Sequence, residues 1–304
     1  MKIVQFRAGD YEAVGYLEGD SIIDLSRAVD IQVSVHGWFS PVPPLSDLGT
    51  ISGLLELGTF EVGWVREVRE FVAKHGLENE LRIGLKDVEL LAPIPRPPRI
   101  IALGLNYAAH AAEGGRKPPK EPIFFVKAST AVIGPDEPVV CPQNVGRIDH
   151  EVELAVIIGK EGRRIPRAKA SGYIAGYTVL NDVTARDMQR RDMAASNPWF
   201  MSKSFDTFAP MGPCVVLPDG IQEPIELDLT LRVNGEVKQH SNTRQLIFTI
   251  PELIHRLSRH ISLQPGDVIS TGTPEGISPI KPGDVMEAQV ERIGVLRNPV
   301  IARK

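Results

Sequence analysis

The chain has 304 residues, of which 42% are hydrophobic and 24% are charged, as in ordinary globular proteins rather than fibrous or disordered chains. A formal net charge of −4 provides no bulk positive field for holding nucleic acid or an anionic membrane. No stretch approaches the roughly 18 apolar residues of a membrane span, the first residues lack the pattern of a secretory signal, and two cysteines cannot build a disulfide framework. We therefore expect a cytoplasmic enzyme or binding protein with no nucleic-acid or membrane partner.

The first 92 residues predict a small α+β domain. Three short strands are expected in KIVQFRA, EAVGYLE and SIIDLS, which alternate apolar and polar residues and are separated by Gly-Asp turns. A proline-rich loop is expected around Pro41, Pro43 and Pro44. The segment 61–75 predicts a helix, because apolar residues recur there at helical spacing and a glycine follows.

A proline-rich stretch separates this part from the rest of the chain. Residues 92–99 read APIPRPPR, and four prolines in eight residues cannot continue a helix or a central strand. We predict a linker at 93–99 and a second domain at 100–304. The alternative is a long surface loop within one domain.

The second part is expected to be mostly β with short helices. Strand patterns lie in RIIALGLN, EPIFFVKAS, HEVELAVIIG, GYIAGYTVLND, CVVLP, LTLRVNGEVKQHS and DVMEAQVERIGVLRNPV. The pair Asn234-Gly235 predicts a two-residue hairpin. Helices are expected near 106–113, 184–191 and 251–260.

Three carboxylates stand out around two of these strands. Glu151 and Glu153 are two residues apart, so on a strand they point to the same face. Asp182 ends the apolar strand that follows. For the glutamates the alternative is a solvent-exposed face, and for Asp182 it is a helix cap.

Taken together, Glu151, Glu153 and Asp182 predict a metal site. Three carboxylates form an all-oxygen donor set, which suits Mg²⁺, Mn²⁺ or Ca²⁺ rather than zinc. They fill half of an octahedron, which leaves positions for water and for a chelating substrate such as a 2-oxo acid. An anionic substrate also requires positive groups, for which Lys127, Lys203 and Arg186 are candidates. Each of them has a surface charge as its alternative.

A histidine and a glutamate form a candidate proton-transfer pair. His110 and Glu113 are three residues apart and would be neighbours on a helix. A carboxylate beside a histidine orients the ring and raises its basicity. Gly114 and Gly115 follow, which indicates a lid that closes over substrate. Further along, the turn TGTPEG places Thr273 and backbone amides where they could hold a carboxylate.

These segments, in this order, resemble the fumarylacetoacetate hydrolase family. The matching stretches cover nearly all of residues 99–304: GLNYAAHAAE, EPIFFVKAST, DHEVELAVIIGK, GYTVLNDVTARDMQ, KSFDTFAPMGP, NGEVKQHSNTRQLIF and ISTGTPEGI. The resemblance implies a mixed β-sandwich roll, one Mg²⁺ or Mn²⁺, and a homodimer. The aspartate that fumarylacetoacetase adds before its histidine is missing from residues 100–106, so the chain resembles the three-carboxylate branch of the family.

Roles for individual residues also follow from the resemblance. It makes Glu151, Glu153 and Asp182 the metal ligands, with Ca²⁺ as an ion that crystals can contain in their place. It makes His110 and Glu113 the catalytic dyad, with Lys203 beside them. Groups that bind substrate or stabilise the transition state are then Lys127, Gln189, Arg186 and Thr273.

The branch does not fix the reaction. We expect hydrolysis of the carbon–carbon bond of an acylpyruvate through a metal-stabilised enolate. Alternatives are a 2-hydroxyhepta-2,4-diene-1,7-dioate isomerase, a decarboxylase of 5-oxopent-3-ene-1,2,5-tricarboxylate or oxaloacetate, and a dehydratase of sugar-derived 2-oxo acids. Several of these reactions belong to aromatic catabolism. A non-catalytic protein that binds metal and oxo acid is the alternative of another class. Substrate selectivity is expected in the lid and in the loop 191–200, where Trp199 and Phe200 would line a pocket, an interface or the core.

Overall fold

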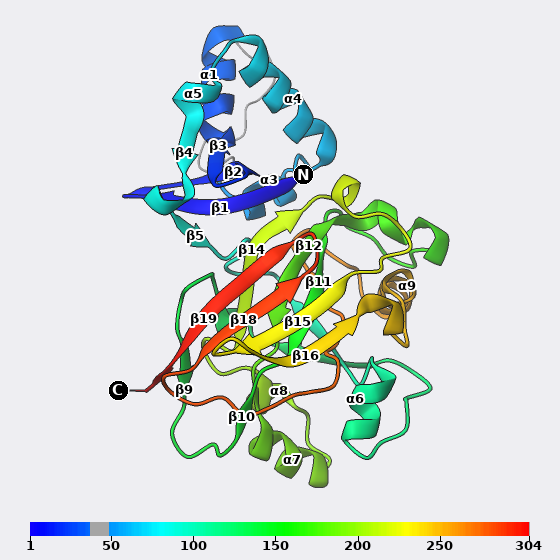
Figure 1. Ribbon diagram of the computed structural model, residues 1–304. Coiled ribbons are helices and arrows are strands. Elements are labelled where there is room, and N and C mark those ends of the chain that lie inside the picture. Colours follow the sequence, from blue (N-terminus) through cyan, green and yellow to red (C-terminus); the bar gives the residue numbers. More distant parts are fainter. Residues whose placement is uncertain (37–48, 304) are drawn as a thin grey trace.

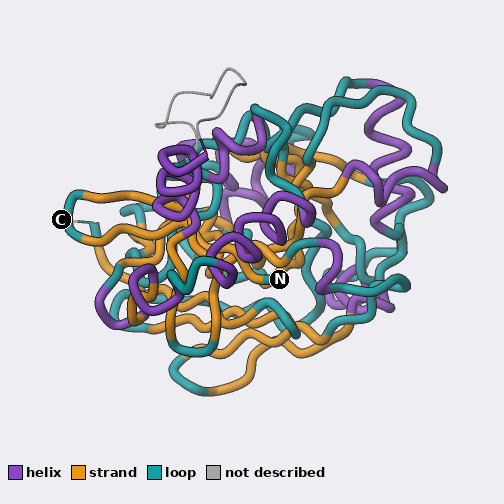
Figure 2. The backbone as a smooth tube through the Cα atoms, turned by 90° about the horizontal axis from the view of Figure 1, so that it is seen from above, coloured by secondary structure: helices purple, strands orange, loops and turns teal. Residues whose placement is uncertain are grey.

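The computed structural model describes residues 1–36 and 49–303, so the predicted proline-rich loop around Pro41, Pro43 and Pro44 lies outside the described residues. Strands dominate the fold (Figure 1), and Figure 2 shows them in orange among short helices and loops. The fold class is therefore the predicted one. Among the described residues, no helix has both the length and the apolar content needed to cross a membrane.

A large twisted sheet runs through the whole molecule in the order β4-β3-β2-β1-β14-β12-β11-β17-β6-β7. Two further strands join it at the side: β5 pairs with β1, and β8 pairs with β14. The strands of this sheet are β1 (Lys2–Ala8), β2 (Tyr11–Glu18), β3 (Ser21–Asp24), β4 (Arg82–Gly84), β5 (Glu89–Leu91), β6 (Ile100–Gly104), β7 (Ile123–Lys127), β8 (Val132–Ile133), β11 (Val152–Ile158), β12 (Ile174–Asn181), β14 (Ala209–Val216) and β17 (Val268–Ser270).

A second sheet packs on the first. Its order is β16-β15-β18-β19-β9, and β10 pairs separately with β13. These strands are β9 (Val139–Cys141), β10 (Ile148–Asp149), β13 (Thr184–Ala185), β15 (Asp228–Val233), β16 (Glu236–Asn242), β18 (Val285–Val290) and β19 (Gly294–Ala302). The hairpin between β15 and β16 turns at Asn234 and Gly235, whose φ values of 53° and 80° match the predicted two-residue turn.

Helices are short and lie around the sheets. α1 (Leu25–His36), α3 (Ile51–Glu56), α4 (Val62–Lys74) and α5 (Glu78–Leu81) belong to the N-terminal part, and α6 (Ala108–Glu113), α7 (Arg186–Ala194), α8 (Phe200–Lys203) and α9 (Ile250–His260) to the rest. Figure 1 shows α6, α7 and α8 at the end opposite to α1 and α4. Short 3₁₀ turns complete the chain at η1 (Leu85–Asp87), η2 (Ser129–Ala131), η3 (Arg167–Tyr173), η4 (Pro218–Gly220) and η5 (Thr243–Gln245).

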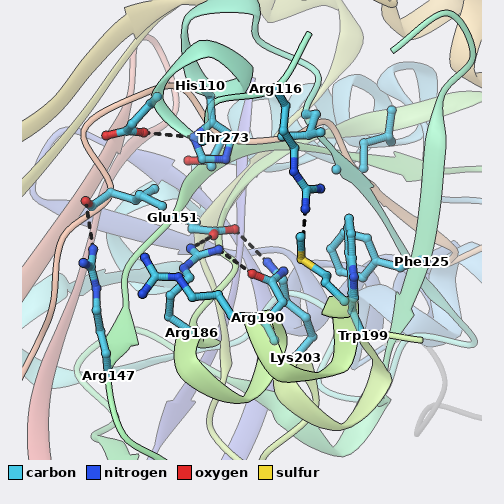
Figure 3. A pocket seen from close by; sticks show the side chains of 18 residues that line it. His110, Arg116, Phe125, Arg147, Glu151, Arg186, Arg190, Trp199, Lys203 and Thr273 are labelled. Carbon is cyan, nitrogen blue, oxygen red and sulfur yellow. Dashed lines mark hydrogen bonds and ion pairs between the residues drawn. The ribbon is translucent and has the colours of Figure 1, made fainter. Parts of the chain in front are cut away.

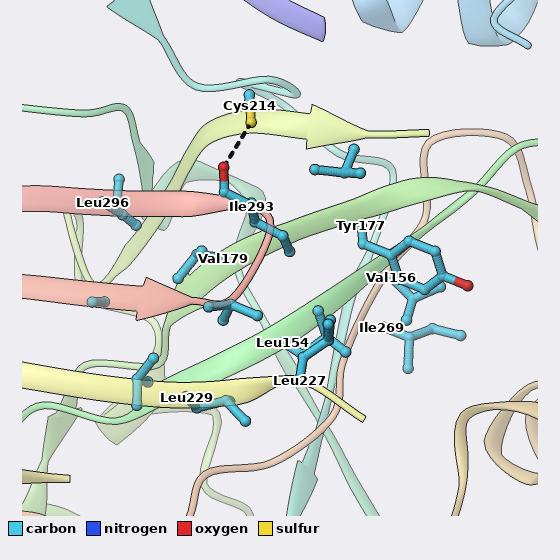
Figure 4. Packing of buried hydrophobic residues seen from close by; sticks show 14 of the residues in the cluster. Leu154, Val156, Tyr177, Val179, Cys214, Leu227, Leu229, Ile269, Ile293 and Leu296 are labelled. Carbon is cyan, nitrogen blue, oxygen red and sulfur yellow. Dashed lines mark hydrogen bonds between the residues drawn. The ribbon is translucent and has the colours of Figure 1, made fainter. Parts of the chain in front are cut away.

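The main core lies between the two sheets (Figure 4). Leu154 and Val156 of β11 and Val179 of β12 meet Leu229 of β15 and Leu296 of β19 in this layer. The opposite face of β11 is also covered, so all seven of its residues are buried. This corrects the alternative of a solvent-exposed face for Glu153, because both faces of the strand belong to the interior.

The strand predicted in SIIDLS is shorter than expected. It ends at Asp24, and α1 begins at Leu25. The Asp24 carboxylate accepts a hydrogen bond from the Arg27 backbone N–H at 2.9 Å, as a helix cap does. The N-terminal strands also continue the main sheet, since Lys2 of β1 pairs with Val216 of β14. The division of the chain at 93–99 stays a prediction.

Candidate active site

Three carboxylates converge where β11 begins and β12 ends. The strands are antiparallel with Val152 opposite Asn181, so Glu151 before β11 lies beside Asp182 after β12. The Asp182 backbone N–H donates to the Glu151 carbonyl at 2.8 Å. Carboxylate oxygens of Glu151, Glu153 and Asp182 lie within 4.8 Å of one another, and all three residues are buried.

Buried cations surround this cluster. Lys203 Nζ donates to Asp182 Oδ2 at 2.5 Å and to Glu151 Oε2 at 2.7 Å. Lys127 Nζ donates to Asp182 Oδ1 at 2.5 Å, and the Arg186 guanidinium donates to Glu151. Asp182 is therefore not a helix cap. Its two oxygens accept from lysines, and α7 begins without a side-chain cap.

Glu153 shows that the cluster fits a cation. Its Oε2 accepts from Ser270 Oγ at 2.5 Å and from the Gly272 backbone N–H at 2.8 Å. Within the described part of the chain, its Oε1 is buried and has no hydrogen-bond partner, and such an oxygen is costly unless something binds it. An orphaned carboxylate oxygen facing two further carboxylates is the donor set of a hard divalent cation.

The two glutamates differ in their protonation. Burial raises the pKa of Glu151, but the Lys203 ammonium and the Arg186 guanidinium outweigh burial and lower the pKa below its ordinary value. Burial raises the pKa of Glu153 well above its ordinary value, and the neighbouring Asp182 and Glu151 carboxylates raise it further. Of the two glutamates in the metal-free protein, Glu153 is thus the one whose surroundings favour the protonated form.

We expect metal binding to release that proton, because a carboxylate must be ionised to act as a ligand. Above the ordinary pKa of 4.5, the metal-free folded chain keeps a proton that the unfolded chain loses. The free energy of unfolding of the metal-free protein therefore falls as the pH rises through this window, while affinity for the metal rises. Calorimetric titration with Mn²⁺, in buffers of different ionisation enthalpy, counts the released protons. An affinity that does not change with pH would contradict the assignment of the proton to Glu153.

A cavity of about 550 Å³ opens above the cluster. Glu151 and Lys203 line it, whereas Glu153 and Asp182 do not belong to its lining (Figure 3). His110 and Glu113 come from α6 and belong to the wall, and His110 Nδ1 lies 3.2 Å from Glu113 Oε2. The predicted pair thus exists, and it lies in the same cavity as the metal-ligand candidate Glu151.

Helix α6 is tied to the turn that follows β17. Glu113 Oε1 accepts a hydrogen bond from the Gly276 backbone N–H at 3.1 Å, so Glu113 contacts both the histidine and this turn. Gly276 has φ +92°, and a Cβ there would lie 2.1 Å from the Lys238 carbonyl oxygen. Only glycine fits this position without movement of the backbone.

Replacing Gly276 with alanine should therefore loosen the turn and the lid together. We expect a loss of about 1–3 kcal/mol of unfolding free energy, from a strained φ and a backbone clash. Chemical denaturation of Gly276→Ala measures the loss. Gly235→Ala serves as the control for a strained φ, since Gly235 also has a positive φ but a Cβ there would meet no atom within 4 Å. Equal losses in the two variants would contradict the role of the close approach to Lys238.

The other predicted residues take different places. Arg186 and Gln189 line the cavity and bond to each other at 2.5 Å, while Lys127 lies behind Asp182 and outside the lining. Thr273 lines the cavity, but its hydroxyl donates to the Val152 carbonyl at 2.9 Å and accepts from a glutamine amide. Trp199 lines the cavity, and its neighbour Phe200 is exposed.

Further residues at the site carry no motif that sequence reasoning could use. Asp149 is fully buried and accepts from Arg147 at 2.6 Å and from Arg186 at 2.8 Å, so it fixes two arginines of the cavity wall. Its one signal in the sequence is its place two residues before Glu151. Arg116 in the predicted lid and Met193 in the loop 191–200 lie where selectivity was expected. The remaining unpredicted wall residues are Leu103, Gly104, Leu105, Phe125, Arg190 and Ile277.

Comparison with known proteins identifies the family. The model of the fumarylacetoacetate (FAA) hydrolase C-terminal family matches residues 99–301, and the chain belongs to this family. Human mitochondrial oxaloacetate tautomerase is 36% identical over an alignment that covers 99% of this chain and 92% of that protein.

Two solved structures extend the comparison. Maleylpyruvate hydrolase from Sphingobium sp. SYK-6, solved with manganese(II) and pyruvate, is 31% identical with a TM-score of 0.77, and the match covers 100% of both chains. The 2-hydroxyhepta-2,4-diene-1,7-dioate isomerase from Mycobacterium marinum is 29% identical with a TM-score of 0.74, over 100% of this chain and 99% of that one. The relatives thus include a tautomerase, a hydrolase and an isomerase, and one of them was solved with a divalent metal ion.

Proposed function

We propose that the chain is a divalent-metal-dependent enzyme of 2-oxo acids, and that it hydrolyses the carbon–carbon bond of an acylpyruvate. The observation that carries this proposal is the His110–Glu113 pair on the wall of the cavity that Glu151 and Lys203 also line. A base and a candidate metal site that share one cavity are what enolate chemistry requires.

We assign Mg²⁺ or Mn²⁺ to Glu151, Glu153 and Asp182, which together supply only oxygen donors. When bound, the cation supplies Lewis-acid stabilisation of negative charge on the oxygen of a chelating 2-oxo acid. Support comes from the orphaned Glu153 oxygen and from the manganese(II) of the maleylpyruvate hydrolase.

The protein residues would move protons and balance charge. Glu113 accepts from His110 and orients the ring, so that the second ring nitrogen can take a proton from water. Hydroxide then attacks the distal carbonyl, the carbon–carbon bond breaks, and the pyruvate enolate takes a proton at carbon 3. Lys203 lines the cavity, and burial lowers its pKa less than the Asp182 and Glu151 carboxylates raise it. Its ammonium therefore stays charged and offsets negative charge on the substrate.

Keto–enol tautomerisation is the second candidate. The same pair would move a proton directly between carbon 3 and the 2-oxo oxygen, without attack by water. The observation in favour is the tautomerase relative, which matches 99% of this chain. A binding protein without turnover would have no use for the His110–Glu113 pair, and we do not favour it.

The homodimer and the cytoplasmic location remain proposals. The homodimer is supported by apolar side chains near one edge of the main sheet: Val126 on β7 and Phe200 and Met201 on α8 are between 41% and 60% exposed. Sedimentation of the purified protein tests it, and a monomer at micromolar concentration would contradict it.

Ultraviolet absorbance of two substrates tests the reaction. The protein is stripped with a chelator and then offered acetylpyruvate or oxaloacetate, with and without Mg²⁺ or Mn²⁺. Loss of acetylpyruvate that depends on added metal supports hydrolysis. Faster conversion of enol to keto oxaloacetate, without release of CO₂, supports tautomerisation, and release of CO₂ indicates decarboxylation. No metal-dependent change with either substrate would overturn both candidates.

A further inference from the structure

The cavity holds more positive charge than its metal end requires. Among the described residues that line it, five side chains are cationic and two are carboxylates; the cations are Arg116, Arg147, Arg186, Arg190 and Lys203, and the carboxylates are Glu113 and Glu151. At the floor, three buried cations, Lys127, Lys203 and Arg186, already pair with the candidate metal ligands. The excess positive charge lies on the cavity walls, at Arg116 and Arg190.

Arg116 differs from the other four cations in its partner. Lys203 and Arg186 pair with the buried carboxylates, and Arg147 pairs with Asp149. Within the described part of the chain, the Arg116 side chain has one hydrogen bond, from Nη2 to Met193 Sδ at 3.7 Å (Figure 3). A thioether is a weak acceptor, so an anion would readily displace it.

Arg190 lies on the helix that Arg116 reaches. Arg190 and Met193 are three residues apart on α7, and side chains at this spacing are neighbours on a helix surface. The only carboxylate paired with Arg190 in the described structure is Asp187, at 3.5 Å, and both side chains of that pair are more than half exposed. Two guanidinium groups that face one cavity repel each other unless an anion lies between them.

We propose that Arg116 and Arg190 form the site that reads a distal carboxylate on the substrate, and that occupying this site closes the lid. The substrate class is a 2-oxo acid with a second carboxylate at its far end. This inference rests on the proposed function for the near end, which places the 2-oxo carboxylate at Glu151, Glu153 and Asp182. Phe125 and Trp199, which stack edge to face with centroids 5.3 Å apart, give the carbon chain an apolar wall.

Lid closure follows from the position of Arg116. The Arg116 backbone N–H donates to the Ala111 carbonyl at 2.8 Å, and the Gly114 N–H donates to the His110 carbonyl at 3.2 Å. Arg116 and His110 therefore belong to one short hydrogen-bonded segment. A carboxylate held between Arg116 and Arg190 would fix this segment to α7, and the His110 ring would be held over the substrate. Arg116 is thus a specificity residue that also positions His110.

Calorimetric binding tests the inference without any need for turnover. The Mn²⁺-loaded protein is titrated with oxaloacetate, 2-oxoglutarate and 2-oxoadipate, whose distal carboxylates reach to increasing distance. Counterparts that lack only the distal charge are 2-oxobutyrate, 2-oxopentanoate and 2-oxohexanoate, and 5-methyl-2-oxohexanoate has nearly the shape of 2-oxoglutarate. We expect at least one dicarboxylate to bind roughly ten- to a hundredfold more tightly than its counterpart, as a charge-assisted pair allows.

Two variants assign that preference to the arginines. Arg116→Gln and Arg190→Gln should each remove most of the preference for dicarboxylates. Binding of the counterparts without the distal charge should stay within about twofold of the wild type. Arg191→Gln is the matched control, because Arg191 is an exposed arginine of α7 that does not line the cavity. Hydrogen–deuterium exchange of the backbone amides of residues 108–116 reports on the lid, and 2-oxo dicarboxylates should slow this exchange in the wild type but not in Arg116→Gln.

The outcomes separate the two proposals. If dicarboxylates and counterparts bind equally, or if Arg116→Gln keeps the preference, the distal site is wrong while the 2-oxo acid site stands. If no 2-oxo acid binds the Mn²⁺-loaded protein, the proposed function itself fails. If the preference is lost equally in Arg191→Gln, it arises from overall charge, and the distal site is overturned.

Discussion

Asp182→Asn should lose metal binding and at least about a thousandfold of metal-dependent turnover, because the cation's contribution to the transition state amounts to several kcal/mol. Asparagine keeps the shape of the side chain and removes one of the three negative charges that would bind the cation. Metal content after dialysis and turnover on the active substrate are the two measurements. Asp10→Asn, at an exposed turn, is the control for a lost surface carboxylate and should change neither. Full turnover in Asp182→Asn would contradict the metal site.

The same substitution also has a cost in stability, which must be separated from the loss of metal. Asp182 accepts from both Lys127 and Lys203, whose side chains are at most 3% exposed. Removing one partner of a buried ion pair costs about 3–5 kcal/mol. Glu153→Gln avoids this problem, since Ser270 and Gly272 are the hydrogen-bond partners of Glu153 in the described structure. We expect Glu153→Gln to fold normally and still lose the metal.

His110→Asn should lower turnover by roughly a hundred- to ten-thousandfold, the usual contribution of a general base, and leave metal and 2-oxo acid binding intact. The His110 imidazole is the proposed proton-transfer group, and no other histidine lines the cavity within the described residues. Steady-state kinetics and binding calorimetry on the same preparation separate the effect on turnover from the effect on binding. His260→Asn, an exposed position at the end of α9, is the control.

Glu113 completes this prediction. Glu113→Gln should cost about ten- to a hundredfold in turnover, since it orients the ring and holds the turn at Gly276 but takes no proton itself. A His110→Asn variant with wild-type turnover would show that the pair takes no part in the reaction. Loss of 2-oxo acid binding in that variant would show that the histidine is a binding residue.

The strands and the cluster of three carboxylates were predictable from the sequence because both depend on local patterns. The carboxylates lie two residues apart in DHEVEL or directly after an apolar strand, and the dyad has helical spacing. The burial of Glu151 and Glu153 could not be read locally, because alternation along β11 does not say whether the second face is covered. That depends on packing against both a second sheet and the N-terminal part.

The wall of the cavity was the least predictable part of the site. Arg116, Arg147 and Arg190 lie in segments far apart in the chain, and each of them alone resembles a solvated surface charge. Arg186 was expected to bind substrate, yet its guanidinium already pairs with Asp149 and Glu151. The tertiary fold decides which carboxylates pair with a buried arginine, so the spacing of residues along the sequence does not predict these ion pairs.

Hydrogen exchange at carbon 3 of pyruvate is the most direct test of metal-dependent enolate formation with His110 as the base. Both proposed reactions, hydrolysis and tautomerisation, pass a proton to or from this carbon, so the test does not depend on the distal group. In D₂O, with the Mn²⁺ or Mg²⁺ form of the protein, we expect exchange of the methyl protons, followed by NMR on samples quenched with chelator. Exchange should disappear in the metal-stripped protein and in His110→Asn. Pyruvate that binds the metal-loaded protein without exchanging its methyl protons would contradict the account.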